Sequence, residues 1–161
     1  MDSLPILRTL SMVGVSLVSS TLASCGKAPP APVTMSSPIA AGVSPLVLSA
    51  RLSGSDEVPP ATGSGVGRVE ATLNAQSHVL TWTATYSALT DAASAAHFHG
   101  PAAGGENAAV VVPVRGSLES PIIGTITVTA AQMAELVASK WYLNVHTAAH
   151  RNGEIRGQLN V

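Results

Sequence analysis

The chain has 161 residues, a formal net charge of -1 and charged side chains at only 11% of its positions. A charge so close to zero excludes the basic field that attracts nucleic acid and the acidic tail of a disordered, solvating segment. The length favours one folded domain with appended segments over two domains. Aromatic residues make up 3% of the chain, so the core must be built from Val, Leu, Ile and Ala.

The first 24 residues have the pattern of a cleavable export signal. A positive charge at Arg8 precedes an apolar run over 10–23, which is shorter than the roughly 20 residues of a membrane-spanning helix. The alternative is a buried core helix, but serines and a glycine occur all round such a helix. We therefore expect residues 1–24 to be removed on export.

The segment Leu22-Ala23-Ser24-Cys25 resembles a bacterial lipobox, in which cleavage precedes the cysteine and the thiol receives lipid. This resemblance implies an envelope protein that is anchored to a membrane through Cys25. Gly26 follows instead of an aspartate, which implies the outer membrane, on its periplasmic side or at the cell surface. Cys25 is the only cysteine, so intrachain disulfides and sites built from several thiolates are excluded.

Residues 25–45 form the predicted tether between this lipidated cysteine and the folded domain. The segment holds five of the eleven prolines, at positions 29, 30, 32, 38 and 45. Proline has no backbone N–H and favours extended polyproline conformations, so such a segment cannot join a sheet. We expect the folded domain to begin at Leu46.

Residues 46–161 contain short runs of strand type separated by turn residues. The expected strands are 46–53, 66–73, 78–86, 94–99, 108–114, 122–128, 141–147 and 154–160. In 79–86 apolar residues alternate with threonines, as in a strand with one buried face. The turn at 74–77 predicts a hairpin, and Thr129 with Gln132 forms a capping box that predicts one short helix. Strands at this spacing indicate an all-β sandwich or barrel.

The histidines suggest a metal site. His97 and His99 are two residues apart, so on a strand they point to the same face, with Cα atoms about 6–7 Å apart. In 141–147 the apolar residues face one way, while Asn144 and His146 face the other. If this strand pairs with 94–99, three imidazoles meet, and His150 is a candidate fourth ligand.

Imidazole ligands suit copper or zinc, and copper(II) is the stronger binder in the general order of affinities. We therefore predict copper, with zinc as the alternative. We expect Asn144 and Glu154 to lie behind the ligands and orient them. The competing interpretation is a hydrogen-bonded histidine cluster at the rim of the sheet without a metal. His78, at the predicted hairpin, is expected to be solvent-exposed.

Two other pairs of charged residues have simple structural interpretations. Glu154 and Arg156 share a strand face, and the simplest interpretation is an ion pair or a pair of loop anchors. Asp56 and Glu57 are adjacent and would diverge on a strand, so we predict an edge loop without a metal role. The sequence has no nucleophile elbow, P-loop or dinucleotide fingerprint, so any catalysis would have to come from a bound metal.

Three stretches resemble the signature segments of CHRD (chordin-type) domains, in the expected order. They are GSDEVPP at 54–60, AHFHGPA at 96–102, and YLNVHT at 142–147 continuing into GEIRGQL at 153–159. The resemblance covers nearly all of 46–161. It implies an antiparallel Greek-key β-sandwich, of immunoglobulin-like or Cu/Zn superoxide dismutase-like type. His150 is at a position where the family is not expected to have a histidine.

Three functions remain open at this point. The first is an envelope-anchored metal-binding protein, for copper, that serves in binding, storage or tolerance. The second is a non-enzymatic structural or protein-interaction module. The third is a superoxide dismutase-like metalloenzyme. Metal stoichiometry separates the second from the others, and a redox turnover assay separates the first from the third.

Overall fold

The computed structural model describes residues 44–161. The export signal predicted for 1–24, the lipid site at Cys25 and nearly all of the predicted tether lie outside the described residues. Among the described residues, no helix has the length and apolar character needed to cross a membrane.

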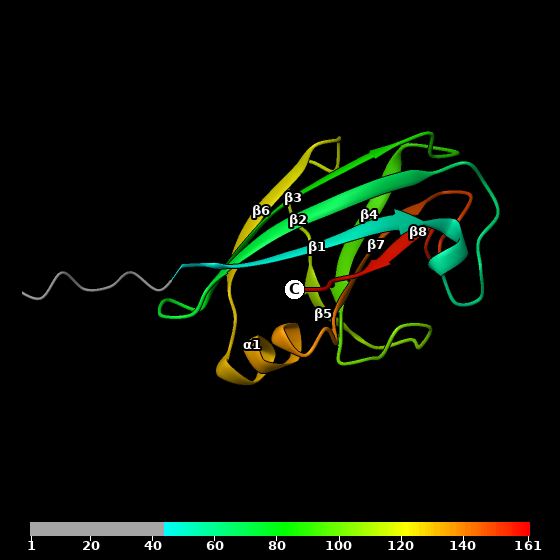
Figure 1. Cartoon of the computed structure of the whole chain (residues 1–161). Coiled ribbons are helices and arrows are strands. Elements are labelled where there is room, and N and C mark those ends of the chain that lie inside the picture. The colour runs from blue at the N-terminus through cyan, green and yellow to red at the C-terminus, as the bar shows by residue number, and fades with distance from the viewer. Residues whose placement is uncertain (1–43) are drawn as a thin grey trace, which may run out of the picture. The chain divides into compact units, whose positions relative to one another are not determined.

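Eight strands and one α-helix follow each other in the predicted order (Figure 1). They are β1 (Leu46–Ser53), β2 (Val66–Asn74), β3 (Val79–Ser87), β4 (Ala93–His99), β5 (Val110–Pro113), β6 (Ile122–Thr127), α1 (Ala130–Val137), β7 (Tyr142–Thr147) and β8 (Ile155–Gln158). A short 3₁₀ helix, η1 (Gly54–Asp56), follows β1. The predicted capping box at Thr129 begins α1, and the predicted turn joins β2 to β3, where Asn74 Oδ1 accepts two backbone N–H groups.

The strands form one continuous antiparallel sheet, in the order β5-β4-β7-β8-β1-β2-β3-β6. We call β5, β4, β7 and β8 the β7 half, and β1, β2, β3 and β6 the β1 half. Among the described residues, strand pairing connects the two halves only between β8 and β1, through the pairs Ser53–Arg156 and Ser49–Asn160. The predicted all-β, antiparallel character with one short helix is therefore confirmed, whereas a two-sheet sandwich is not shown.

The sheet curls so that its two halves share one core. Trp82 on β3 and Phe98 on β4 belong to strands far apart in the sheet order, yet their rings meet edge to face at 5.0 Å between centroids. Apolar side chains of both halves, together with Leu136 of α1, make up a single buried cluster. Burial of this apolar face is the main favourable contribution to the fold.

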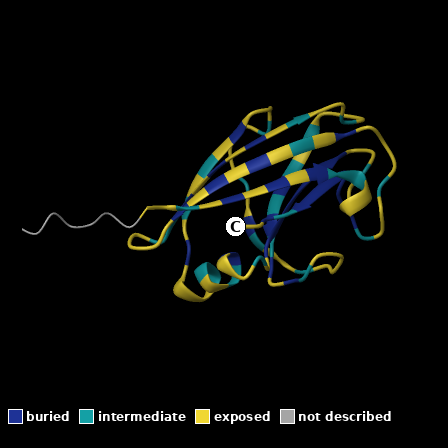
Figure 2. Cartoon of the chain, in the orientation of Figure 1, coloured by how far each residue is buried: buried dark blue, intermediate teal, exposed yellow. Residues whose placement is uncertain are grey.

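The outer face differs between the halves. In β2 and β3 buried residues alternate with exposed ones, whereas all six residues of β7 are buried (Figure 2). Leu143 and Val145 belong to the core, so the buried outer residues of β7 are Tyr142, Asn144 and His146. Polar groups buried away from water need partners, so the outer face of β7 must supply hydrogen-bond or metal partners for these side chains.

Candidate metal centre

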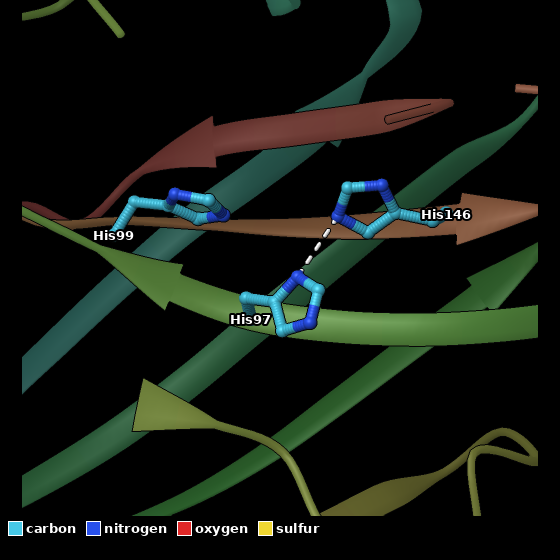
Figure 3. A group of neighbouring side chains, drawn as sticks. All are labelled: His97, His99 and His146. Atoms are coloured by element: carbon cyan, nitrogen blue, oxygen red, sulfur yellow. Dashed lines mark hydrogen bonds between the residues drawn. The ribbon is translucent and has the colours of Figure 1, made fainter. Parts of the chain in front are cut away.

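Three histidines converge on the outer face of the β7 half. His97 and His99 lie on β4 and His146 lies on β7, and antiparallel pairing places His97 opposite Asn144. One nitrogen from each ring lies within 4.8 Å of the others (Figure 3). His146 is 9% exposed, and the other two rings are half-buried. The predicted meeting of these side chains across paired strands is confirmed.

Backbone carbonyls fix the orientation of two of the rings. His99 Nδ1 lies 2.9 Å from the carbonyl oxygen of Ala108, and His146 Nδ1 lies 3.0 Å from that of Arg151. A carbonyl oxygen can only accept, so each Nδ1 carries the proton and donates it. In the neutral ring the lone pair is then on Nε2. This is the arrangement typical of metal-binding histidines, whose other nitrogen donates to a carbonyl or carboxylate.

The unprotonated Nε2 atoms of His99 and His146 both lie near the side-chain oxygen of Asn144. Asn144 Oδ1 lies 3.0 Å from Nε2 of both His99 and His146, and His97 Nδ1 lies 3.0 Å from the same His146 nitrogen. With both Nε2 atoms unprotonated, the amide oxygen faces two acceptors. Either a cation between them or a turned-over amide that presents its NH₂ group relieves this contact. A bound cation is therefore one of two ways to satisfy these nitrogens.

The spacing of the rings suits a first-row transition metal. Such an ion binds imidazole nitrogens at about 2.0–2.1 Å, which places the nitrogens roughly 3 to 4 Å apart in tetrahedral or square arrangements. The observed separations extend up to 4.8 Å, so the rings would move closer together when an ion binds. Ligation by imidazole alone suits copper and zinc, and the described residues of the group include no thiolate to separate the two metals.

The surroundings of His97 and His146 favour the neutral imidazole. Burial lowers the pKa of His97 below its ordinary value of 6.5, and the neighbouring His146 and His99 lower it further. Burial also lowers the pKa of His146, against the opposing effect of its bond to the Arg151 carbonyl. A neutral imidazole has a lone pair for a metal, so at neutral pH protons compete weakly for these sites.

A stack of three side chains holds His99 in place. Its ring lies parallel to that of Tyr142, with 4.7 Å between centroids and 2° between planes. The Arg156 guanidinium lies 3.4 Å from the centroid of the same Tyr142 ring. Arg156 is 2% exposed and donates to the Glu106 carbonyl and to the Asn107 side chain. The guanidinium thus ties the loop after β4 to β8, and through Tyr142 it restrains the imidazole.

Glu57 is a buried neighbour of this polar layer that the sequence did not reveal. It was predicted to lie in an edge loop, yet it is 5% exposed, and its Oε1 has no hydrogen-bond partner among the described residues. Burial raises its pKa to about 7, against the opposing effects of Arg156 and of a hydrogen bond with Asn144. Nothing in the local pattern distinguishes it from its exposed neighbour Asp56.

The structure places the other predicted site residues apart from the three rings. His150 is half-buried in the β7–β8 turn and is not a member of the convergent group. His78 is half-buried at the β2–β3 turn, rather than solvent-exposed as expected, and its backbone has a positive φ of 57°.

Glu154 does not approach the histidine group through a hydrogen bond. Its carboxylate accepts from the Thr90 backbone N–H at 2.7 Å, the Thr90 hydroxyl at 2.8 Å and the Thr147 hydroxyl at 2.7 Å. Burial alone would raise its pKa, but these hydrogen bonds lower it below the ordinary value. Glu154 and Arg156 therefore anchor two different loops, and the ion pair between them is not formed.

Comparison with known proteins agrees with the signature segments. No curated protein matches the chain significantly, and no solved structure does. Residues 48–159, which include most of β1, all of β2 to β8 and the three converging histidines, match the CHRD domain. The chain therefore belongs to the CHRD domain family.

Proposed function

We propose that this protein binds one divalent transition-metal ion through His97, His99 and His146. The observation that carries the proposal is the pair of Nδ1–H···O=C hydrogen bonds, which leave the Nε2 lone pairs of His99 and His146 facing each other and Asn144 Oδ1. Three imidazole nitrogens and one amide oxygen near a shared point provide the donor types of a transition-metal site, and this supports the proposal over a rim cluster without a metal.

Copper(II) is the ion that we propose, with zinc as the alternative. At sites built from nitrogen donors, copper(II) binds more tightly than the other divalent ions of the first row. The ligand set supports binding, storage or tolerance, because the chemistry described needs only capture of the ion. Asn144 would position the rings or occupy a further coordination position.

We further propose that the domain is held at the bacterial cell envelope, by lipid on Cys25, where it would meet metal ions from outside the cytoplasm. The support is the lipobox resemblance at 22–25 and the proline-rich segment that follows it. The intact mass of protein extracted from membranes should correspond to a chain beginning at Cys25 with attached acyl groups. Membrane binding that is unchanged in Cys25→Ala would contradict the anchor.

Calorimetric titration of the purified protein with copper(II) and with zinc(II) tests the metal site. We expect one ion per chain, tighter binding of copper, and loss of binding in the variant that replaces all three histidines with alanine. His78→Ala is the matched control, because it removes an imidazole outside the group. If neither metal binds at micromolar concentration, or the triple variant binds as well as the wild type, an interaction module becomes the better hypothesis.

A further inference from the structure

The two ends of the sheet differ in how well they resist pairing with another chain. At one end β5 has only four residues, finishes at Pro113, and pairs with β4 through an irregular register. Short length, proline, bulges and charged side chains are the features that usually protect an edge strand. At the other end β6 has six residues in uninterrupted register with β3, without proline or charge (Figure 1). The β6 edge, the side of β6 that faces away from β3, therefore has none of these features.

The free backbone groups of the β6 edge belong to Ile123, Thr125 and Thr127. The N–H of Val128 donates to the carbonyl of His78, which lies just before β3. Because bonding alternates along an antiparallel ladder, the even-numbered residues of β6 then bond to β3. The three odd-numbered residues point their N–H and C=O groups the other way, where no strand is paired with β6 among the described residues. The edge thus presents three donors and three acceptors in a row.

One register pairs this row completely with a copy of itself. When two antiparallel copies are related by a twofold axis at Thr125, Thr125 is opposite its own counterpart and Ile123 is opposite Thr127 of the other copy. All three donors then meet acceptors. A shift toward Pro121 leaves a carbonyl opposite a residue that has no N–H. A shift the other way leaves a carbonyl opposite Thr129, whose N–H already donates within the capping box of α1.

The side chains of the outer face also suit this register. The hydroxyls of Thr81 and Thr125 lie 3.2 Å apart on neighbouring strands, and Thr72 on β2 is opposite Thr81. Pairing at Thr125 continues this row of threonines into the second copy, and cross-strand threonine pairs stabilise a sheet. Ile123 is 65% exposed, and in the pair it is partly removed from water beside Thr127 of the other copy. No charges of like sign are opposed, because β6 has no charged residue.

We propose that the β6 edge pairs with the β6 edge of a second copy of this chain, antiparallel about Thr125, to form a symmetric dimer with one continuous sheet. The twofold axis closes the assembly at two copies, because the protected β5 strand lies at each far end. Six residues from each copy make a small interface, so the dimer is reversible and depends on concentration. The surface includes none of the three converging histidines and does not rest on the proposed metal site.

Sedimentation velocity of the purified protein, in the presence of a metal chelator and up to millimolar concentration, tests the proposal. We expect a monomer–dimer equilibrium that is weakened about tenfold or more by Thr125→Pro, which removes an outward N–H, and by Thr125→Lys, which opposes two like charges. Thr72→Lys is the matched control, since it makes the same change on the exposed face two strands away and should associate as the wild type does. Unchanged melting of each variant at low concentration shows that the fold is intact.

Cross-linking tests the register. In a chain that carries Cys25→Ser, Thr125→Cys should oxidise to a disulfide-linked dimer, because opposite Cα atoms of a hydrogen-bonded pair are about 5.5 Å apart, within disulfide range. Thr72→Cys should not cross-link.

Three results would overturn the proposal: a monomer at millimolar concentration, which would leave the edge to a strand of another protein; association that both Thr125 variants leave unchanged; or growth beyond the dimer. The variant that replaces all three histidines with alanine should dimerise as the wild type does, so failure of the metal site and failure of the dimer are distinguishable.

Discussion

The two halves of the curled sheet share one core but differ in their outer faces. In the β1 half the outer face is in contact with water, with threonines and a serine on β3 and the charged Arg68 and Glu70 among the exposed residues of β2. In the β7 half the corresponding face of β7 is buried beneath loops and carries Tyr142, Asn144 and His146. The loops are tied down by polar bonds, such as that from the Asn107 amide to the Val58 carbonyl at 2.8 Å.

This difference explains why the histidine group lies on the outer face of the β7 half. A polar face open to water leaves each imidazole hydrated and free to rotate, whereas a covered face desolvates it and supplies fixed carbonyl partners. Burying the polar side chains of β7 costs free energy unless each of their polar groups is hydrogen-bonded. Glu57, with one unpaired oxygen, shows that the pairing is incomplete.

The shared core should show the largest effect. Phe98 belongs to the β7 half, is completely buried and contacts Trp82 of the β1 half. We expect Phe98→Ala to lower the free energy of unfolding by about 3–5 kcal/mol, through lost burial and the cavity that remains. Urea denaturation measures this, with Ile123→Ala, at a 65% exposed site in β6, as a control that should change stability by about 0.5 kcal/mol or less. A loss under about 1 kcal/mol would contradict a core common to both halves.

The covered polar face should make stability depend on pH through Glu57. Its pKa in the folded protein, about 7, lies above the ordinary 4.5, so folding favours the protonated form. The associated stability is complete below pH 4.5 and is lost as the pH rises through 7. At about 1.4 kcal/mol per pKa unit, Glu57→Gln should be more stable than the wild type by up to about 3 kcal/mol at pH 8, with no such gain at pH 4.

Denaturant unfolding at the two pH values measures the Glu57 effect. The exposed neighbour provides the control: Asp56→Asn should leave stability nearly unchanged at both values. A Glu57→Gln variant that is no more stable than the wild type at pH 8 would show that the carboxylate is ionised without penalty, and hence that this face is better hydrated than its burial indicates.

Metal binding at the β7 half should stabilise the folded protein. Because the ion binds the folded form, a hundredfold excess over Kd should add about 2.7 kcal/mol, measured as a rise in melting temperature with copper(II). His97→Ala, His99→Ala and His146→Ala should each remove most of this rise relative to their own metal-free form. His150→Ala is predicted to have a smaller effect, and His78→Ala none.

The pH dependence of metal binding has the opposite sign from that of Glu57. The lowered pKa values of His97 and His146 keep both imidazoles neutral at pH 7, so protons compete with the metal only at pH values below the ordinary 6.5. Affinity should therefore be constant near neutrality and should fall in acid, as titrations at several pH values would measure. An affinity that rises on acidification would contradict ligation by these rings.

The smallest effect compares one substitution in both halves. Thr147 on β7 is fully buried and donates to Glu154, whereas Thr83 on β3 is exposed. We expect Thr147→Ala to lower the free energy of unfolding by about 1–3 kcal/mol and Thr83→Ala to change it by about 0.5 kcal/mol or less. Equal losses in denaturant unfolding would mean that the end of β7 is no better shielded from water than the outer face of β3.

Local chemistry was enough to predict most of the secondary structure. Alternation in 79–86 indicated β3, the turn beginning at Asn74 indicated the β2–β3 hairpin, and Thr129 with Gln132 indicated α1; all are observed. The same alternation placed His97 with His99 and set His146 opposite the apolar residues of its strand. These features depend on residues within one strand or one turn, where backbone geometry fixes which way a side chain points.

Contacts between distant segments decided the rest. A single curled sheet in place of a sandwich depends on the pair Ser53–Arg156, which joins residues that are far apart in sequence. Burial of Glu57 depends on loops that come from either side of it, and the tautomer of His99 depends on the carbonyl of Ala108. Strand periodicity reports which face a residue occupies and carries no information about what covers that face. The sequence by itself therefore determined the strands and the histidine pair, whereas the tertiary structure alone decided that loops cover those histidines and that carbonyls orient them.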